Sequence, residues 1–343
     1  MHEVMTLRGT PICVLASGDP FFFGVGVTLM RHVAREECRT YPAPSSFSLA
    51  ASRLGWALQD IETVSLHGRP IDLIRPLLHP GCRVLALTSD AQGPAALAQL
   101  LSNSGFGASR MTVLEALGGA DERLRSCTAF DFAFDEVNDL NVVALELRAD
   151  RPSRILPLAH GLDDTLFEHD GQITKREIRA VTLSALAPRR GELLWDVGAG
   201  SGSIGIEWML AHPSMRAIAI EADTDRATRI GRNSAAFGVP GLQIVEGSAP
   251  AALHGLTPPD AIFLGGGGSD PGVLEATIEH LKPGGRLVAN AVTLEMEVIL
   301  LAAQARHGGN LIRIQVSRAA AVGSMQGWKP AMPVTQWTWI KQG

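Results

Sequence analysis

The stretch LLWDVGAGSGSIGIEW, residues 193–208, constrains the fold of this chain more than any other. An apolar run leads into Asp196, and Gly198, Gly200 and Gly202 follow before a helical stretch begins. Glycines at these positions let a ligand approach the backbone, and the first amides of the following helix face that ligand. The pattern predicts a strand, loop and helix of a doubly wound sheet, with a ligand at the carboxyl end of the strand.

The ligand predicted at this loop is a nucleoside. Glu221 ends the next apolar run, where a carboxylate can accept hydrogen bonds from two ribose hydroxyls. Gly200, Gly202 and Gly205 also satisfy the G-x-G-x-x-G pattern, so a dinucleotide is the alternative. Asp196 favours S-adenosylmethionine, because a carboxylate beside the loop would repel a pyrophosphate and can organise the ammonium group of methionine.

Two further features favour a methyltransferase. The EGSAP turn at 246–250 falls where the adenine edge of the cofactor would lie, and the chain ends in strands expected to form an antiparallel pair. Four consecutive glycines at 265–268 follow the fourth predicted strand of this half. We expect them to let a large flat substrate lie against the backbone near the methyl donor.

The length and the spacing of apolar runs predict two α/β domains. A chain of 343 residues with 46% hydrophobic and 5% aromatic residues suits two tightly packed α/β cores. Residues 148–172 interrupt the alternation of strands and helices, so we place domains at 1–150 and 173–343, with a linker at 151–172. Strands are predicted in a largely parallel first sheet at 12–16, 38–41, 63–66, 83–87, 111–114 and 141–147, and in the second domain at 193–197, 217–221, 242–246, 261–265, 286–292, 311–316 and 334–340.

The second domain is expected to begin with an amphipathic helix. Thr174 and Glu177 have the spacing of a capping box, and Pro188 ends the stretch. The apolar stripe predicted to face the core consists of Ile178, Val181, Leu183 and Leu186.

Charge and cysteine content exclude several classes of partner. A net charge of -5 argues against duplex nucleic acid, and no apolar stretch approaches the ~18 residues of a membrane span. The four cysteines form no CxxC pair, which indicates reduced thiols, and the histidines show no metal-ligand spacing. We expect a cytoplasmic homo-oligomer that binds a small molecule but no metal, nucleic acid or membrane.

Several segments together resemble a known family. HDGQITKREIRA, LLWDVGAGSGSIGIEW, FLGGGGS and LVANAVTLE resemble the C-terminal half of the decarboxylating precorrin-6Y C5,15-methyltransferases of cobalamin biosynthesis. VLASGDPFFFGVG, YPAPSSFSLAASRLGW and VSLHGRP are similar to the tetrapyrrole methylases, which form the N-terminal half of the same enzymes. The resemblance implies a Rossmann-like class I methyltransferase domain preceded by a tetrapyrrole methylase domain, with S-adenosylmethionine as cofactor.

The resemblance also implies the reactions. The C-terminal half would methylate C15 of precorrin-6Y and decarboxylate a ring acetate, and the N-terminal half would methylate C5. Only thirteen residues precede VLASGDP, so we expect the first domain to lack the family's first strands and helices, which leaves its C5 activity open. The alternative function is methylation of RNA or of another small molecule, although the chain has no N/D-P-P-Y signature. A third hypothesis makes the first domain a scaffold for oligomerisation.

The chemistry requires positioning more than a protein nucleophile, because an electron-rich substrate carbon attacks the sulfonium methyl group. A poly-carboxylate substrate requires cations, for which Lys175, Arg176, Arg318 and Lys329 are candidates, with solvated surface charges as the alternative. His169 could transfer a proton or merely pair with Asp170, and Trp328 could stack on the macrocycle or pack, as we expect for Trp337 and Trp339.

The predicted site residues fall into three groups. Candidate catalytic residues are His169 and Lys175. Cofactor-binding residues are Gln172, Thr174, Asp196, Gly198, Ala199, Gly200, Ser201, Gly202, Glu221, Ser248, Ala249 and Gly265, with Gly18, Asp19 and Pro20 in the first domain. Substrate-binding residues are Gly266, Gly267, Gly268, Asn290, Arg318 and Lys329.

Overall fold

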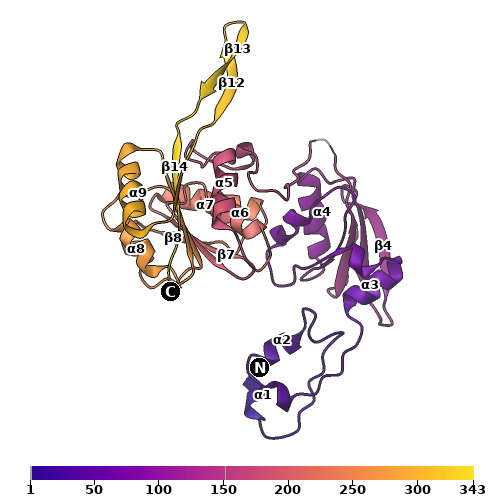
Figure 1. Ribbon diagram of the computed structural model, residues 1–343. Helices are drawn as coiled ribbons and strands as arrows, with labels where there is room; N and C mark the ends of the chain where they lie inside the picture. Colours follow the sequence, from indigo (N-terminus) through magenta and orange to yellow (C-terminus); the bar gives the residue numbers. More distant parts are fainter. Residues whose placement is uncertain (1, 151) are drawn as a thin grey trace. The chain divides into compact units, whose positions relative to one another are not determined.

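The computed structural model describes residues 2–150 and 152–343 (Figure 1). The chain forms two compact units, residues 1–155 and 156–343. Each unit has its own core, and each is described by itself.

A seven-stranded sheet organises the second unit, in the order β11-β14-β10-β9-β6-β7-β8. The strands β10, β9, β6, β7 and β8 pair in parallel, and β14 runs antiparallel between β10 and β11. All seven strands predicted for this half are confirmed: β6 (Leu193–Val197), β7 (Arg216–Glu221), β8 (Gln243–Glu246), β9 (Ala261–Leu264), β10 (Arg286–Ala291), β11 (Asn310–Ile314) and β14 (Val334–Ile340).

Helices cover both faces of this sheet. One core joins α5 (Arg176–Leu186), α6 (Ser203–Leu210) and α7 (Thr224–Ala236) to one face, and the other joins α8 (Val273–His280) and α9 (Leu294–His307) to the opposite face. Because neighbouring strand residues point to opposite faces, Leu194 enters the first core and Trp195 the second. Two short 3-10 helices complete the unit, Asp164–Leu166 and Ala251–Leu253.

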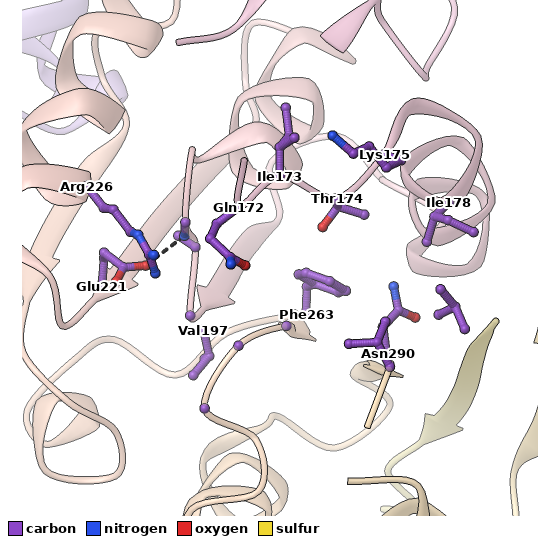
Figure 2. Close-up of a pocket in the computed structure, with 18 of the residues that line it drawn as sticks. Gln172, Ile173, Thr174, Lys175, Ile178, Val197, Glu221, Arg226, Phe263 and Asn290 are labelled. Carbon is purple, nitrogen blue, oxygen red and sulfur yellow. Dashed lines mark hydrogen bonds between the residues drawn. The ribbon is translucent and has the colours of Figure 1, made fainter. Parts of the chain in front are cut away.

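The first turn of α5 differs from the predicted capping box. The N-cap residue is Lys175, whose backbone is extended, and no side chain caps the helix. The helix therefore begins at Arg176. The side chain of Thr174 lines a cavity instead of capping the helix (Figure 2). The predicted apolar stripe is right except at Val181, which is 37% exposed.

A buried ion pair ties the segment before α5 to the core. Arg179 and Glu207 are both buried, and their side chains pair. Glu207 also accepts hydrogen bonds from the backbone amides of Gly161 and Leu162, and Arg179 donates to the carbonyl oxygens of Leu162 and Thr174. With these partners the two buried charges are satisfied, and they fix the backbone as far as Thr174.

A β-hairpin between β11 and β14 was not predicted. Its strands are β12 (Ser317–Val322) and β13 (Met325–Pro330). Both strands are largely exposed, so they lack the apolar alternation that marks a half-buried strand. Trp337 and Trp339 pack as predicted, whereas Trp328 is 78% exposed.

The first unit contains a mixed sheet rather than the largely parallel one predicted. The order is β1-β2-β5-β3-β4, in which β1 and β2 alone pair in parallel among the described residues. Its strands are β1 (Glu62–Ser65), β2 (Arg83–Leu87), β3 (Arg110–Glu115), β4 (Arg123–Thr128) and β5 (Asn141–Glu146), and its helices are α1 (His2–Thr6), α2 (Val25–Leu29), α3 (Ser46–Leu54) and α4 (Gly93–Asn103), with 3-10 helices Arg35–Glu37, Leu58–Asp60 and Ile71–Leu77.

Two predicted strands of the first unit are wrong. Residues 12–16 and 38–41 are not strands, and Leu15 is 92% exposed. An apolar run forms a strand only when its backbone can hydrogen-bond to another strand. In the described sheet the edge strand β1 pairs with β2 alone, so neither run has a partner there. The strand β4 was missed because its sequence, RLRSCT, carries two arginines. None of the helices described here is long and apolar enough to cross a membrane.

Candidate functional site

A cavity of about 580 Å³ opens at the carboxyl ends of β6, β7, β9 and β10 (Figure 2). This is the edge of a doubly wound sheet at which ligands bind. The predicted site residues that line it are Gln172, Thr174, Lys175, Gly198, Ala199, Gly200, Glu221, Ser248, Ala249, Gly265, Gly266, Gly267, Asn290 and Arg318.

Two glycine loops meet backbone to backbone at the floor of the cavity. The amide of Gly265 donates to the carbonyl oxygen of Val197, and the amide of Gly266 donates to that of Gly198 at 3.4 Å. A Cβ at Gly198 would lie 2.1 Å from the carbonyl oxygen of Gly266, and Gly198 has a φ of +70°. Only glycine fits at position 198, so the close approach of the second loop requires a glycine in the first.

The carboxylate of Glu221 is held at the tip of β7. It accepts one hydrogen bond from the amide of Gly200, at 2.7 Å (Figure 2), and another from the amide of Asp223, at 3.1 Å. The Glu221 residue is 6% exposed and still lines the cavity. Its carboxylate therefore faces the space beside the glycine loop from a fixed position.

Asp196 lies behind the glycine loop rather than in the cavity. Its side chain is 1% exposed, and Oδ2 accepts a hydrogen bond from the amide of Gly205, in the first turn of α6. Oδ1 is buried without a hydrogen-bond partner among the described residues. Burial raises the pKa of Asp196 to about 7, with a further contribution from the charge of Glu221. Asp196 fixes the start of α6 and thus the loop in front of it.

One wall of the cavity is a strap of residues 168–174 that crosses from the segment before α5. Asp170 pairs with Arg226 and Arg229 of α7, at 2.8 and 3.2 Å. The Asp170 carboxylate also accepts a hydrogen bond from the amide of Gln172, and this bond, together with the two arginines, lowers the pKa of Asp170. The strap is thereby anchored to the helix that follows Glu221.

Further bonds hold the first residue of the strap. The amide of Glu168 donates to the Asn233 side chain, which donates back to the Glu168 carbonyl oxygen and also to that of Ser201. Asn233 is 2% exposed. The buried side-chain amide of Asn233 on α7 therefore links the strap to the glycine loop.

Positively charged side chains lie near the first turn of α5. Arg318 of β12 pairs with Glu177 in the first turn of α5. Lys329 stands directly opposite Arg318 in the register of the hairpin, so both side chains project from the same face. Lys175 lines the cavity and lies 3.9 Å from a carboxylate oxygen of Asp164.

Some predicted site residues lie outside the cavity lining. Ser201 and Gly202 lie behind the loop, and a Cβ at Gly202 would lie 2.8 Å from the side chain of Ile230. A Cβ at Gly268 would meet the side chain of Met296 at 2.7 Å. The remaining predicted residues are Lys329 on β13, His169, whose ring accepts a hydrogen bond from the amide of Gly171, and Arg176, at the start of α5.

Gly18, Asp19 and Pro20 belong to the first unit. They form a tight turn in which the Asp19 carboxylate accepts a hydrogen bond from the amide of Phe21. A Cβ at Gly18 would lie 3.3 Å from the Pro44 carbonyl oxygen and from Ser45 Cα. The turn thus packs against the residues that lead into α3.

Several cavity residues were not predicted from the sequence. They include Ile173, Glu177, Ile178, Arg226, Phe263 and Asp270, together with the rim residues Val292, Val316, Met332 and Val334. Position after a strand could have indicated Arg226 and Val292, which follow β7 and β10. The rim residues at the base of the hairpin carried no signal, because the hairpin was unpredicted. No cluster of three metal-ligating side chains occurs within residues 2–150 and 152–343.

Comparisons with known proteins agree on both halves of the chain. Residues 165–341 match the precorrin methyltransferase domain, and residues 5–133 match the tetrapyrrole (corrin/porphyrin) methylases. A Sinorhizobium precorrin-6Y C(5,15)-methyltransferase [decarboxylating] is 69% identical over 339 residues, which cover 99% of this chain and 82% of the relative.

A shorter relative and a solved structure each match about half of the chain. The cobalt-precorrin-6B C(15)-methyltransferase (decarboxylating) of Salmonella typhimurium is 35% identical over 50% of this chain and 92% of its own length. The crystal structure of the C-terminal domain of a Rhodobacter capsulatus precorrin-6Y C5,15-methyltransferase superposes with a TM-score of 0.52 and 48% identity, covering 54% of this chain and 100% of the domain.

Proposed function

The chain belongs to the family of decarboxylating precorrin-6Y C5,15-methyltransferases, and from that premise we propose that its second unit methylates C15 of a precorrin and decarboxylates a ring acetate. The cavity where the Gly198–Gly202 loop meets Glu221 and the second glycine loop carries this proposal. The shorter Salmonella relative is named for C15 methylation and decarboxylation alone, and it matches a share of this chain as large as the second unit.

The residues at the cavity fit S-adenosylmethionine. Gly200, with a φ of +61°, leaves its backbone open to the cavity, and the Glu221 carboxylate stands where it can accept hydrogen bonds from two ribose hydroxyls. Ser248 and Ala249, which line the cavity next to β8, would lie beside the adenine. When bound, the cofactor supplies an electrophilic methyl group on a sulfonium.

Cations beyond the cofactor fit a poly-carboxylate macrocycle. Arg318 and Lys329 are like charges directly opposite each other on an exposed hairpin, and Glu177 pairs with Arg318. Lys175, which lines the cavity, adds a third positive charge. Arginine and lysine recognise carboxylates through charge-assisted hydrogen bonds.

The chain's own residues position the reactants. The apolar side chains of Phe263, Ile178 and Val334 exclude water from the floor and wall of the cavity. The peripheral carboxylates of the substrate would bind Arg318 and Lys329, so that an electron-rich macrocycle carbon faces the methyl group. Holding two reactants in this geometry lowers the barrier without a protein nucleophile. Loss of carbon dioxide leaves electrons that the conjugated macrocycle accepts.

We assign C5 methylation to the first unit. Its similarity to the tetrapyrrole methylases over residues 5–133 supports this assignment, as does the turn of Gly18, Asp19 and Pro20 packed beside Ser45. The number of methyl groups transferred by the whole chain measures its contribution.

Calorimetry and kinetics test the cofactor and the substrate class together. The chain should bind S-adenosylmethionine and not NAD, and Arg318→Gln and Lys329→Gln should each raise the KM for precorrin-6Y by about fivefold to tenfold, because each removes a charged hydrogen bond. The affinity for S-adenosylmethionine should not change in either variant. Binding of NAD in place of S-adenosylmethionine would refute the proposal.

A further inference from the structure

Three buried or half-buried polar side chains form a closed hydrogen-bonded ring beside the cavity. Asn290 Nδ2 donates to Thr182 Oγ1 at 3.0 Å, Gln336 Nε2 donates to Thr182 Oγ1 at 3.1 Å, and Gln336 Nε2 donates to Asn290 Oδ1 at 2.9 Å. The residues come from β10, α5 and β14, which are far apart in the sequence. Of the three, Asn290 alone lines the cavity (Figure 2).

The fold brings these three residues together by register. Asn290 and Gln336 are directly paired in the antiparallel strands β10 and β14, so their side chains project from the same face of the sheet. Val288, two residues before Asn290, packs in the core that contains α5, which identifies that face. Thr182, which is 0% exposed, lies on the side of α5 that covers this face of the sheet.

The ring leaves one orientation for the Asn290 amide. Both hydrogens of Gln336 Nε2 are engaged, and both acceptor positions of Thr182 Oγ1 are occupied. A reversed Asn290 amide would set its NH₂ group against the NH₂ group of Gln336. In the observed orientation Asn290 Nδ2 keeps one hydrogen without a partner in the described part of the chain.

The polar ring is retained although it carries an unsatisfied atom. Gln336 is 1% exposed, and its Oε1 has no hydrogen-bond partner among the described residues. Its strand neighbours Trp337 and Trp339 pack in the core on the opposite face of the sheet, and an apolar residue at 336 would leave no such orphan. A buried polar group kept at such a cost is typical of residues with a functional role.

We propose that Thr182 and Gln336 are positioning residues that fix the Asn290 amide so that its free N–H binds a carboxylate or carbonyl oxygen of the macrocycle. The inference rests on the proposed function, because it names a substrate contact at the same cavity. Asn290 stands near the carboxyl end of β10, one residue before the strand ends. A neutral donor there complements the charged groups of the hairpin.

Kinetics of three variants test the ring. Asn290→Ala, Thr182→Val and Gln336→Met should each raise the KM for precorrin-6Y by about tenfold, with kcat and the affinity for S-adenosylmethionine little changed. Thr182→Ser should restore the wild-type KM, because it restores the hydroxyl. The double variant Asn290→Ala/Thr182→Val should be no worse than Asn290→Ala, because both act through one amide.

Thr277→Val is the matched control. Thr277 is also 0% exposed, but its hydroxyl donates to the Leu274 carbonyl oxygen of its own helix, away from the cavity. Its KM should equal that of the wild type. A wild-type KM in both Thr182→Val and Gln336→Met, or an additive effect in the double variant, would overturn the inference.

A spectroscopic readout separates this inference from the proposed function. With asparagine labelled by ¹⁵N, the Asn290 side-chain signal is identified by its loss in Asn290→Ala, and we expect one of its two protons to exchange slowly. That protection should disappear in Thr182→Val and in Gln336→Met. Protection unchanged by either variant overturns the ring whatever the substrate, whereas altered protection without any turnover of precorrin-6Y would refute the proposed function alone.

Discussion

At the scale of single residues, the site requires positions without a side chain as well as particular side chains. Gly198 admits no Cβ because the backbone of Gly266 occupies that space, whereas Gly200 faces the cavity. Asp196 supports the loop from behind. The sequence predicted these residues as a group, but it did not separate those that face a ligand from those that support the loop.

Gly198→Ala should disrupt the loop. The new Cβ would lie 2.1 Å from the Gly266 carbonyl oxygen in a left-handed backbone conformation, and we expect a loss of stability of about 3 kcal/mol or more and no measurable binding of S-adenosylmethionine. Gly191→Ala is the control, because Gly191 has a φ of +83° and nothing within 4 Å of a Cβ. It should cost about 1 kcal/mol and leave binding intact, by thermal unfolding and calorimetry. Equal effects of the two substitutions would show that the contact with Gly266 is unimportant.

Asp196 should make the stability of the second unit depend on pH. Its pKa in the folded chain is about 7, above the value of an unfolded aspartate, so the folded state holds the proton more tightly. Its contribution to the free energy of unfolding is therefore fully present at low pH and falls between about pH 4 and pH 7, by at most about 1.4 kcal/mol per pH unit.

Urea unfolding monitored by tryptophan fluorescence measures this slope, since five of the six tryptophans belong to the second unit. Asp196→Asn keeps an acceptor for Gly205 and removes the titration. Its stability relative to the wild type should rise from pH 5 to pH 7 and then level off. A difference that is the same at every pH would contradict the assignment.

At the scale of secondary-structure elements, prediction succeeded where apolar runs are buried and paired. The runs at 193–197 and 261–265 became β6 and β9 at the centre of the second sheet. The run at 12–16 is also apolar but has no paired neighbour. The hairpin of β12 and β13 was not predicted, because exposed strands carry no hydrophobic alternation.

The strap over the cavity could not be predicted from local sequence. Asp170 and Arg226 are 56 residues apart, and their pairing depends on how α7 packs. Arg179 was equally hidden, because a charged helical residue is normally solvated and its partner Glu207 comes from another helix. Contacts made only in the tertiary structure leave no pattern within one segment.

Asp170→Asn should weaken cofactor binding. The substitution removes the charge that anchors the strap to Arg226 and Arg229, and Gln172 and Thr174 of the strap line the cavity. We expect the Kd for S-adenosylmethionine to rise by about fivefold, measured by calorimetry at moderate ionic strength. Glu168→Gln is the control, because its partner Arg232 is exposed and neither residue lines the cavity. An unchanged Kd in Asp170→Asn would show that the strap does not need this anchor.

At the scale of the whole molecule, the two units have separate cores. The buried clusters of the second unit contain no residue before Leu156, and those of the first unit contain none after Leu147. Residues 156–172, which belong to the linker predicted at 151–172, supply Leu156, Leu162 and Phe167 to the second core. The sequence pattern showed where the rhythm of strands and helices breaks, but not which core that segment would join.

A fragment of residues 156–343 should therefore fold and bind S-adenosylmethionine with the affinity of the whole chain. Its core is complete, and Arg179 and Glu207, which fix the backbone as far as Thr174, lie within the fragment. Circular dichroism and calorimetry of the fragment measure both properties. A fragment that aggregates, while a fragment beginning at residue 140 folds, would show that the second core needs residues before Leu156.

The most direct test of the account is the mass of the product formed by the whole chain from precorrin-6Y and methyl-labelled S-adenosylmethionine. The account predicts loss of carbon dioxide with gain of one labelled methyl group from the second unit and of another from the first. Gain of a single labelled methyl group with loss of carbon dioxide would show that the second unit acts and the first does not. A macrocycle of unchanged mass, in a sample that binds the cofactor, would contradict the central claim.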